Sequence, residues 1–272
     1  MFNPLSDAGV PVLDKPKPVV KTLLIGLGTG RCGTVSLARM LNQHPMFDIT
    51  HEARPLLPWV PDEALFTTSI QCILSRPGSV VGDVSFFWLP YVSMLSAHVA
   101  KLKNVRLRFV AAERPIPEVV ASFQRKVGPG INHWTTNSAL TNPSHIFHSC
   151  FPKYDTDDRA AALSRYCSEY RSGLDQISNA NRKVIKRVRT QDLVPGTIYE
   201  IFQWLGVPHV DVIPVKTNQT RPAAAGQAGG DAARHVNHGH VRTAPKLGKR
   251  THERARRISE AAGHRMQHRR PT

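Results

Sequence analysis

Residues 23–41 read LLIGLGTGRCGTVSLARML, and this stretch predicts the type of fold. The apolar run that ends at Leu27 is bordered by glycine, which is typical of a buried parallel strand. Beyond a turn that holds Gly28, Gly30 and Gly33, apolar residues return with the spacing of a helix. Glycine lets backbone N–H groups approach an anion closely, and the positive end of the next helix adds to the attraction. The stretch therefore predicts a strand, an anion-binding loop and a helix.

The loop has several interpretations. It matches the phosphate-binding pattern GxxxxGK[ST] in part, because Gly28 and Gly33 have the right spacing but Thr34 stands in place of the lysine. The same glycines fit the dinucleotide pattern GxGxxG, and Asp48 follows at the distance where an acid would meet a ribose hydroxyl. A tight turn without a ligand would also use glycine. The basic residue of this loop is Arg31, and the loop alone leaves its ligand open.

The chain has 272 residues and a formal net charge of +16, of which +9 lies in residues 221–272. This length can bury the core of one α/β domain. We expect that domain at residues 19–220, after an irregular N-terminal arm at 1–18. Residues 221–272 form a basic C-terminal tail, which would bind polyanions loosely, be partly disordered, or close over an anionic cofactor.

Composition also bears on the compartment. No apolar run reaches the length of about 18 residues that a membrane span needs, and the N-terminus lacks the apolar core of a signal peptide. The cysteines form no CxxC pair, which argues against a zinc site and suits a reducing compartment. They are Cys32, Cys72, Cys150 and Cys167. We therefore expect a cytoplasmic protein without a metal site.

Strands and helices are expected to alternate along the chain. The predicted strands are 23–27, 46–50, 80–82, 106–112 and 184–188, and the predicted helices are 35–41, 62–74, 86–100, 117–123, 157–180 and 196–205. This alternation predicts an α/β fold with a three-layer parallel sheet and helices on both faces. Residues 128–150 are too apolar for a linker and too interrupted for one helix, so a binding loop and a floppy insertion both fit.

A second motif helps to choose the ligand of the loop. Arg114 follows the strand at 106–112, and Ser122 lies eight positions later on the next predicted helix. The planar fork of an arginine and a hydroxyl group can together bind one phosphate. Ligands of parallel sheets bind where strands end and helices begin, so this pair and the glycine loop could share one ligand.

These two motifs together resemble the sulfotransferases that use 3′-phosphoadenosine 5′-phosphosulfate (PAPS), most of all the carbohydrate-type, heparan-type and bacterial members. RCGT at 31–34 is similar to their 5′-phosphosulfate loop, and ERPIPEVVASF at 113–123 is similar to their 3′-phosphate motif. GDVSFFWLPY at 82–91 and VRTQDLVPGTIYEIFQWLGVP at 188–208 resemble further segments of that family. Arg31 replaces the more usual lysine, Gln191 stands where many members carry glutamate, and the tail holds no clear RKG-type adenine loop.

The resemblance implies a P-loop nucleotide-kinase-like fold and transfer of a sulfuryl group from PAPS to a hydroxyl or amine of a glycan or small-molecule acceptor. It implies no metal, no specific nucleic acid partner and no membrane span. The residues that would bind PAPS are Gly30, Arg31, Cys32, Gly33, Thr34, Val35, Arg114 and Ser122. Arg31 would also stabilise the charge on the leaving oxygen.

The acceptor needs a general base. Glu52 is the first choice, because carbohydrate-type relatives carry a catalytic glutamate after the second strand, and His51 is the second choice. Asp83, after the third strand, is a weaker candidate for the base or for acceptor binding. His133, His145 and His148 are interpreted as incidental and not as a metal site.

Two other functions remain open. One is a dinucleotide-binding oxidoreductase that uses NAD or NADP, which rests on Gly28, Gly30, Gly33 and Asp48. The other is a non-catalytic polyanion-binding protein that acts through its basic tail.

Overall fold

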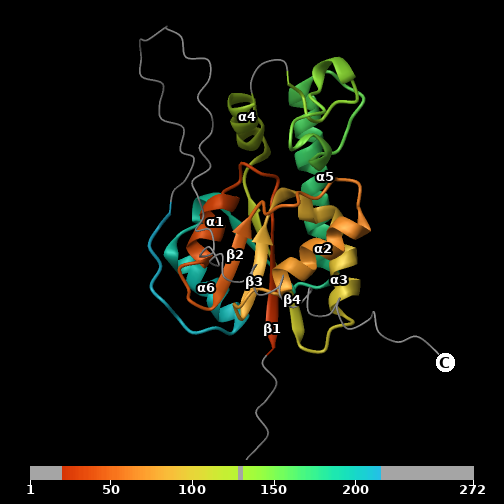
Figure 1. Ribbon diagram of the computed structural model, residues 1–272. Helices are drawn as coiled ribbons and strands as arrows, with labels where there is room; N and C mark the ends of the chain where they lie inside the picture. The colour runs from red at the N-terminus through yellow and green to blue at the C-terminus, as the bar shows by residue number, and fades with distance from the viewer. Residues whose placement is uncertain (1–19, 128–130, 216–272) are drawn as a thin grey trace, which may run out of the picture. The chain divides into compact units, whose positions relative to one another are not determined.

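The computed structural model describes residues 20–127 and 131–215. They form a sheet of five parallel strands in the order β2-β3-β1-β4-β5 (Figure 1). The strands are β1 Lys21–Leu27, β2 Phe47–His51, β3 Val80–Val84, β4 Val105–Glu113 and β5 Ile185–Arg189. This sheet order, with a glycine loop after β1, is that of the P-loop nucleotide-kinase-like proteins, and the predicted fold class is confirmed.

Helices cover both faces of the sheet, because side chains of each strand alternate between two cores. In β1, Leu23 and Ile25 belong to one hydrophobic cluster, and Leu24 belongs to the other. The first cluster takes in residues of α2 Glu63–Leu74, α3 Val92–Val99, α4 Ile116–Lys126 and α5 Arg159–Ala180. The second takes in α1 Thr34–Leu41 and α6 Pro195–Leu205, which lie on the opposite side of the sheet in Figure 1.

The helix ends follow from local sequence. Asp62 caps α2, where its carboxylate accepts from Leu65 N–H at 2.9 Å. Asp158 caps α5 by accepting from the N–H groups of Ala160 and Ala161. Gly206 ends α6 with a φ of 73°, which an L side chain rarely adopts. These caps explain why the predicted and observed bounds of the three helices agree closely.

One predicted helix is wrong. Residues 86–100 do not form a single helix: Phe86–Tyr91 is a 3₁₀ helix, and α3 starts at Val92. Pro90 has no N–H and cannot donate in an α-helical ladder. The Trp88 indole also donates to Asp83 at 2.8 Å, which holds this short segment against the end of β3.

Residues 131–154 connect α4 and α5 without a long helix, as expected, but they are packed. Trp134 is fully buried, meets Phe123 of α4 edge to face and packs at a tilt against Phe151. Tyr154 N–H donates to Trp134 O at 2.7 Å, which joins the two ends of the segment. The described part of this region is therefore packed and does not fit a floppy insertion, and we call residues 131–154 the 131–154 segment.

Some predictions fall outside the described residues. They concern the N-terminal arm at 1–18 and the basic tail at 221–272, including the absence of a clear adenine loop from that tail. Within residues 20–127 and 131–215, no helix has the length and apolar character that crossing a membrane requires.

Candidate functional site

The loop between β1 and α1 is shaped by left-handed backbone. Gly30 and Gly33 have φ values of 79° and 89°, and Arg31 between them has 57°. A Cβ on Gly33 would also lie 3.1 Å from the Thr190 methyl group, so a side chain there would be strained and crowded. Glycine is thus required at both positions. A left-handed arginine is uncommon, and such residues cluster at functional sites.

The loop ends in unpaired N–H groups. Across residues 20–127 and 131–215, the N–H groups of Gly33, Thr34 and Val35 have no protein acceptor. They stand at the positive end of α1, where an anion is stabilised by both the donors and the helix dipole. Cys32 is fully buried, so its thiol does not face a ligand at the surface of the loop.

Three side chains from distant elements brace this loop. The Tyr170 hydroxyl accepts from Gly28 N–H at 2.9 Å, and the Tyr166 hydroxyl donates to Thr29 O at 3.1 Å. The Thr190 hydroxyl lies 2.6 Å from Cys32 O. Sequence reasoning missed these roles, because both tyrosines fit the apolar side of α5 and Thr190 follows β5 without any pattern of its own.

The two predicted anion-binding groups lie together. Arg31 Nε donates to Ser122 Oγ at 3.1 Å, and Arg114 Nη1 donates to Arg31 O at 3.3 Å. Arg114 also forms an ion pair with Glu118 one helical turn away, at 2.8 Å. The glycine loop and the start of α4 therefore meet in one site at the carboxyl ends of β1 and β4.

Positive charge accumulates in this site. Burial lowers the pKa of Arg31, and repulsion from Arg114 and Arg125 lowers it further. Arg125 is a residue that sequence reasoning missed, although its position one turn after Ser122 on the same helix could have suggested it. Three neighbouring guanidinium groups favour a ligand with several negative charges.

The predicted base residues border the same loop. His51 Nε2 lies 3.0 Å from the Thr34 hydroxyl and 3.8 Å from Glu52 Oε1. Glu52 has a φ of 50°, and its N–H is held by the hydroxyl of Ser85 at 2.9 Å. A contact path thus runs from the start of α1 through His51 to Glu52.

The carboxyl group of Glu52 differs from an ordinary glutamate. Burial raises its pKa to about 7, the negative charge of Asp83 acts in the same direction, and Arg31 opposes both. Burial also lowers the pKa of His51, against the attraction of Asp83. Near neutral pH, Glu52 can therefore take up and release a proton, while His51 is neutral.

Asp83 does not suit the role of a base. It is buried, and its two oxygens accept from Thr50 Oγ1 at 2.6 Å, Ala53 N–H at 3.1 Å, the Trp88 indole at 2.8 Å and the Ser85 hydroxyl. These donors occupy both oxygens. Asp83 instead fixes the backbone on both sides of Glu52, which corrects its assignment as a weak candidate for the base or for acceptor binding.

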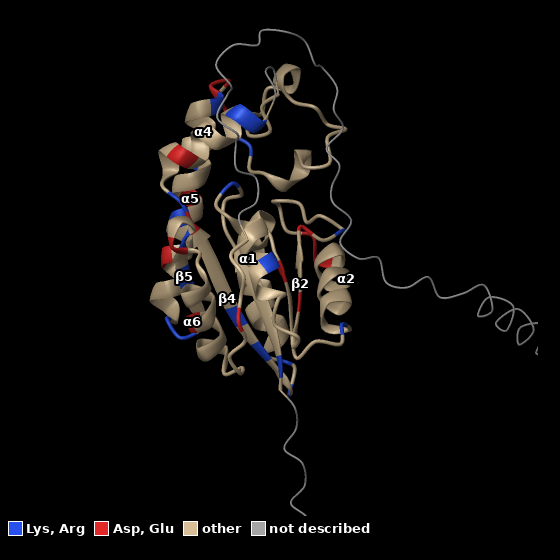
Figure 2. Ribbon diagram, turned by 90° about the vertical axis from the view of Figure 1, so that its left-hand side faces the viewer, with Lys and Arg blue, Asp and Glu red and all other residues tan. Residues whose placement is uncertain are grey.

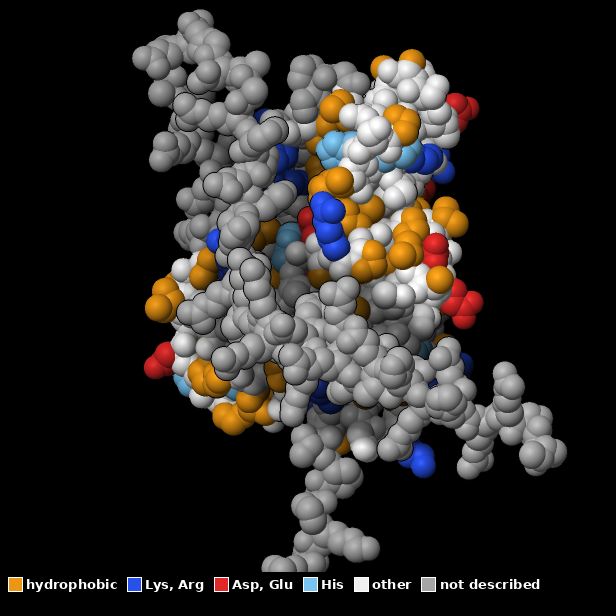
Figure 3. Space-filling view, viewed as in Figure 1, with side chains coloured by type: hydrophobic (Ala, Val, Ile, Leu, Met, Phe, Trp, Pro, Cys, Tyr) orange, Lys and Arg blue, Asp and Glu red, His pale blue; other side chains and the backbone are white. Residues whose placement is uncertain are grey.

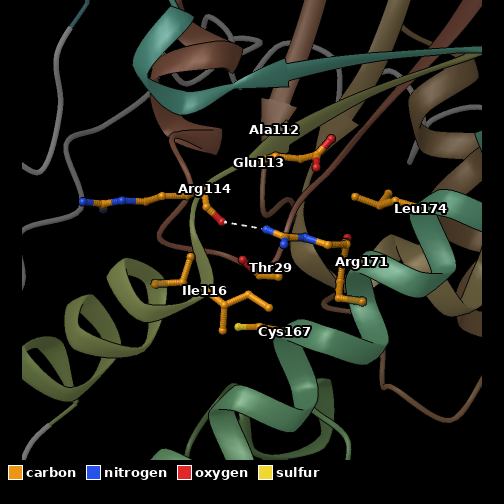
Figure 4. Close-up of a pocket in the computed structure, with 10 residues that line it drawn as sticks. Thr29, Ala112, Glu113, Arg114, Ile116, Cys167, Arg171 and Leu174 are labelled. Carbon is orange, nitrogen blue, oxygen red and sulfur yellow. Dashed lines mark hydrogen bonds between the residues drawn. The ribbon is translucent and has the colours of Figure 1, made fainter.

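A small pocket lies behind the loop, between the end of β4, α4 and α5 (Figure 4). Its volume of about 20 Å³ holds roughly one water molecule and no nucleotide. Figure 4 shows Arg171 reaching into it, where its guanidinium donates to Arg114 O at 3.4 Å, while the Arg114 side chain points away. Arg171 thus supports the backbone that presents Arg114.

The strand order argues against the dinucleotide interpretation. In the dinucleotide-binding fold, the second strand lies beside the first and carries an acid at its carboxyl end. Here β3 separates β2 from β1, and Asp48 is the second residue of β2, paired with Val81. Asp48 is therefore held away from the loop, because the local spacing that suggested it carries no information about strand order.

No protein-family model and no curated protein matches the chain. Among solved structures, it is similar to the YorR protein of Bacillus subtilis, determined in complex with phosphorylated GDP. The two share 12% sequence identity, the similarity covers 69% of this chain and 99% of that one, and the TM-score is 0.42. From its own sheet order and glycine loop, the chain has a P-loop-like parallel α/β fold.

Proposed function

We propose that the protein is a sulfotransferase that uses PAPS and transfers its sulfuryl group to a hydroxyl or amine of a glycan or small molecule. The observation that carries the proposal is the contact between Arg31 Nε and Ser122 Oγ at 3.1 Å. It joins the glycine loop to α4, so one nucleotide with phosphates on its 5′ and 3′ sides could touch both.

The residues present fit such a nucleotide. The unpaired N–H groups of Gly33, Thr34 and Val35 suit a 5′-phosphate at the start of α1. Arg114 and Ser122 suit the 3′-phosphate by residue type, since a guanidinium and a hydroxyl can each donate to phosphate oxygens. PAPS would supply the sulfuryl group. As the bond between sulfur and the 5′-phosphate oxygen breaks, Arg31 would stabilise the negative charge that develops on that oxygen.

Glu52 suits the role of general base. Its pKa of about 7 means that the carboxylate form is present at neutral pH and still accepts a proton readily. Glu52 would take the proton from the acceptor hydroxyl or amine as the acceptor oxygen or nitrogen bonds to sulfur. His51 would stay neutral and orient the Thr34 hydroxyl. The positive charge that the reaction needs comes from arginine, so the proposal requires no metal.

The test uses the 3′-phosphate as the distinguishing group. Ser122→Ala should weaken binding of adenosine 3′,5′-bisphosphate about tenfold, which is the scale of one charge-assisted hydrogen bond, and leave binding of adenosine 5′-monophosphate almost unchanged. Ser178→Ala is the matched control, because the hydroxyl of Ser178, on the far part of α5, donates to Leu174 O within the same helix. Calorimetry on the full chain gives both affinities.

Transfer itself is measured with sulfate-labelled PAPS and a panel of glycans and phenols. Label in any acceptor that is lost in Glu52→Gln supports the proposal. A wild-type chain that does not bind adenosine 3′,5′-bisphosphate, or equal losses in Ser122→Ala and Ser178→Ala, would refute it.

A further inference from the structure

Four groups that can carry positive charge gather in the 131–154 segment. The rings of His133 and His145 have centroids 4.4 Å apart. Lys153 Nζ donates to the carbonyl oxygens of His133 at 2.6 Å and His148 at 2.7 Å. Figure 3 shows histidine side chains on this face of the molecule, near the top of the view. We call these four residues the histidine cluster.

The histidine cluster has unused hydrogen-bonding capacity. His145 Nδ1 accepts from Phe147 N–H at 3.2 Å, so a neutral His145 carries its proton on Nε2. The Nδ1 atoms of His133 and His148 are buried and have no partner among the described residues, and His133 is only 4% exposed. A histidine with a purely structural role normally has its buried nitrogen bonded. Because both Nδ1 atoms are enclosed by protein, a ligand would contact these rings through the opposite ring nitrogen, Nε2.

The groups that lower the pKa of His133 can all carry positive charge, and the one opposing group, the thiol of Cys150, raises the pKa of Lys153. The pKa of His133 is lowered to about 4 by burial first, and then by His145, Lys153, His148 and Arg159 of α5. Burial also lowers the pKa of His145, His148 and Lys153. No carboxylate of the described residues is among the groups that shift these four. An anion beside them would relieve the repulsion and favour their protonated forms.

The cluster lies close to the proposed base. Ser149 O accepts from Trp59 N–H at 2.8 Å, which fastens the turn His148–Cys150 to the loop that follows β2. This hydrogen bond joins the turn that carries His148 to the loop that follows Glu52.

We propose that His133, His145, His148 and Lys153 form a subsite for an acidic group of the acceptor, a carboxylate or a sulfate ester. The inference that the bound acidic group belongs to the acceptor rests on the proposed function, but the anion site itself can be tested alone. It predicts that acidic sugars are preferred over neutral sugars of the same size. Binding takes up protons at the histidines, so affinity rises as pH falls.

The experiment measures the ring signals of the histidines by NMR on the full chain, together with calorimetry. The probes are sodium sulfate, methyl glucuronide and the neutral methyl glucoside. We expect sulfate and methyl glucuronide to raise the pKa of His145 and His148, and methyl glucoside to leave both unchanged. Affinity for methyl glucuronide should be about tenfold higher near pH 5.5 than near pH 8. His51, at 3.0 Å from the Thr34 hydroxyl, reports separately on anions at the glycine loop.

Two variants separate charge from packing. His145→Asn keeps an acceptor for Phe147 N–H and removes the Nε2 donor. It should therefore lower the affinity for methyl glucuronide about tenfold. His148→Gln places an uncharged donor near the Nε2 position, so it should retain binding near pH 8 and lose part of the gain at low pH. His209→Asn, at an exposed histidine that packs on Tyr199, is the control and should change neither.

Unchanged histidine pKa values with both anions would overturn the proposal. Equal affinity for methyl glucuronide and methyl glucoside would also overturn it, whereas binding of sulfate without methyl glucuronide would support the sulfate ester as the acidic group. Binding of adenosine 3′,5′-bisphosphate is measured on the same samples. If the histidine signals respond to the anions but adenosine 3′,5′-bisphosphate does not bind, the proposed function is refuted and the anion site stands. The two results are therefore distinguishable.

Discussion

Glu52 shows at the scale of one residue how the fold prepares a proton acceptor. Its backbone is left-handed, its N–H is bound by Ser85, and its carboxyl group lies between the opposing charges of Asp83 and Arg31. A residue held in this conformation costs energy that surrounding contacts must offset. The cost is consistent with a side chain placed for chemistry and not for stability.

Activity should depend on the protonation state of Glu52. The proposed transfer needs the carboxylate, so its rate should fall as pH drops through about 7, and Glu52→Gln should lower kcat by at least about a hundredfold. Nucleotide affinity should change little, because Arg114 and Ser122 carry it. A pH–rate profile of the wild type and single-turnover rates of the variant check both. A wild-type rate that is flat from about pH 5.5 to 8.5 would contradict this role.

Stability should respond in the opposite direction. The pKa of Glu52 is higher in the folded chain than the unfolded value of 4.5, so folding favours the protonated form. Its contribution is fully present below about pH 4.5 and is lost as pH rises through about 7. Glu52→Gln should therefore be more stable than the wild type near pH 8, by on the order of 2 kcal/mol, and equally stable near pH 4. Urea denaturation at the two pH values measures this difference.

At the scale of elements, α5 acts as the support of the glycine loop. Tyr166 and Tyr170 are buried, and their hydroxyl groups reach two successive residues of the loop, Gly28 and Thr29. The pKa of each phenol is raised by burial, so both stay neutral. The two phenols therefore fix the loop by hydrogen bonds and add no charge to it.

We predict that Tyr170→Phe lowers the free energy of unfolding by about 1–2 kcal/mol, because Gly28 N–H loses its buried acceptor. Nucleotide affinity should fall as well, since the loop is less ordered before binding. Tyr199→Phe is the matched control on α6, where the ring is exposed. Chemical denaturation and calorimetry measure the two effects, and equal stability of both variants would contradict the bracing role.

The end of β3 supports the opposite side of the site. Asp83→Asn replaces an oxygen that accepts two hydrogen bonds with an NH₂ group facing other donors. We therefore expect the free energy of unfolding to fall by about 3 kcal/mol. Glu52 would also lose its fixed position, and kcat should fall with little change in nucleotide affinity. Asp157→Asn, an exposed carboxylate with one bond to Asn137, should cost less than about 0.5 kcal/mol. Similar melting temperatures for the two variants would show that Asp83 is dispensable.

For the whole molecule, the carboxyl ends of the strands collect groups from every part of the described chain. Residues after β1, β2, β4 and β5 take part in or brace the site. Figure 2 shows a second group of positive charges on the opposite half of β4. These are Arg106, which bonds to Thr22 and Leu205 O, and Arg108, which lies over the Trp204 ring. They are tied to the packing of α6 and lie away from the site.

A thermal-shift series tests the ligand class of the whole chain. Adenosine 3′,5′-bisphosphate at about 100 times its Kd should stabilise the protein by about 2.7 kcal/mol, and NAD at the same concentration should not. ATP, which lacks a 3′-phosphate, should give a smaller shift. The shift should shrink as salt rises, because the site binds through charge. A shift with NAD alone would favour the dinucleotide interpretation, and stabilisation by heparin alone would favour a polyanion-binding protein.

The sequence alone predicted most of the elements, and it proposed residues for an anion site that the structure brings into contact. Strand β1, the glycine loop and the caps of α2 and α5 depend on neighbouring residues, so a local pattern contains the information they need. The same local reasoning selected three candidate residues, because each stands after a strand or on the helix that follows it. They are Arg31, Arg114 and Ser122.

Only the tertiary structure decided the strand order, the brace from Tyr170 and the histidine cluster. Strand order removed Asp48 from the loop, although its spacing fitted the dinucleotide pattern. The Tyr170 hydroxyl meets Gly28 across 142 positions of sequence, and the rings of His133 and His145 meet through the folding of a segment without regular periodicity. Contacts of this kind arise from packing of distant parts of the chain, and a local sequence pattern carries no record of that packing.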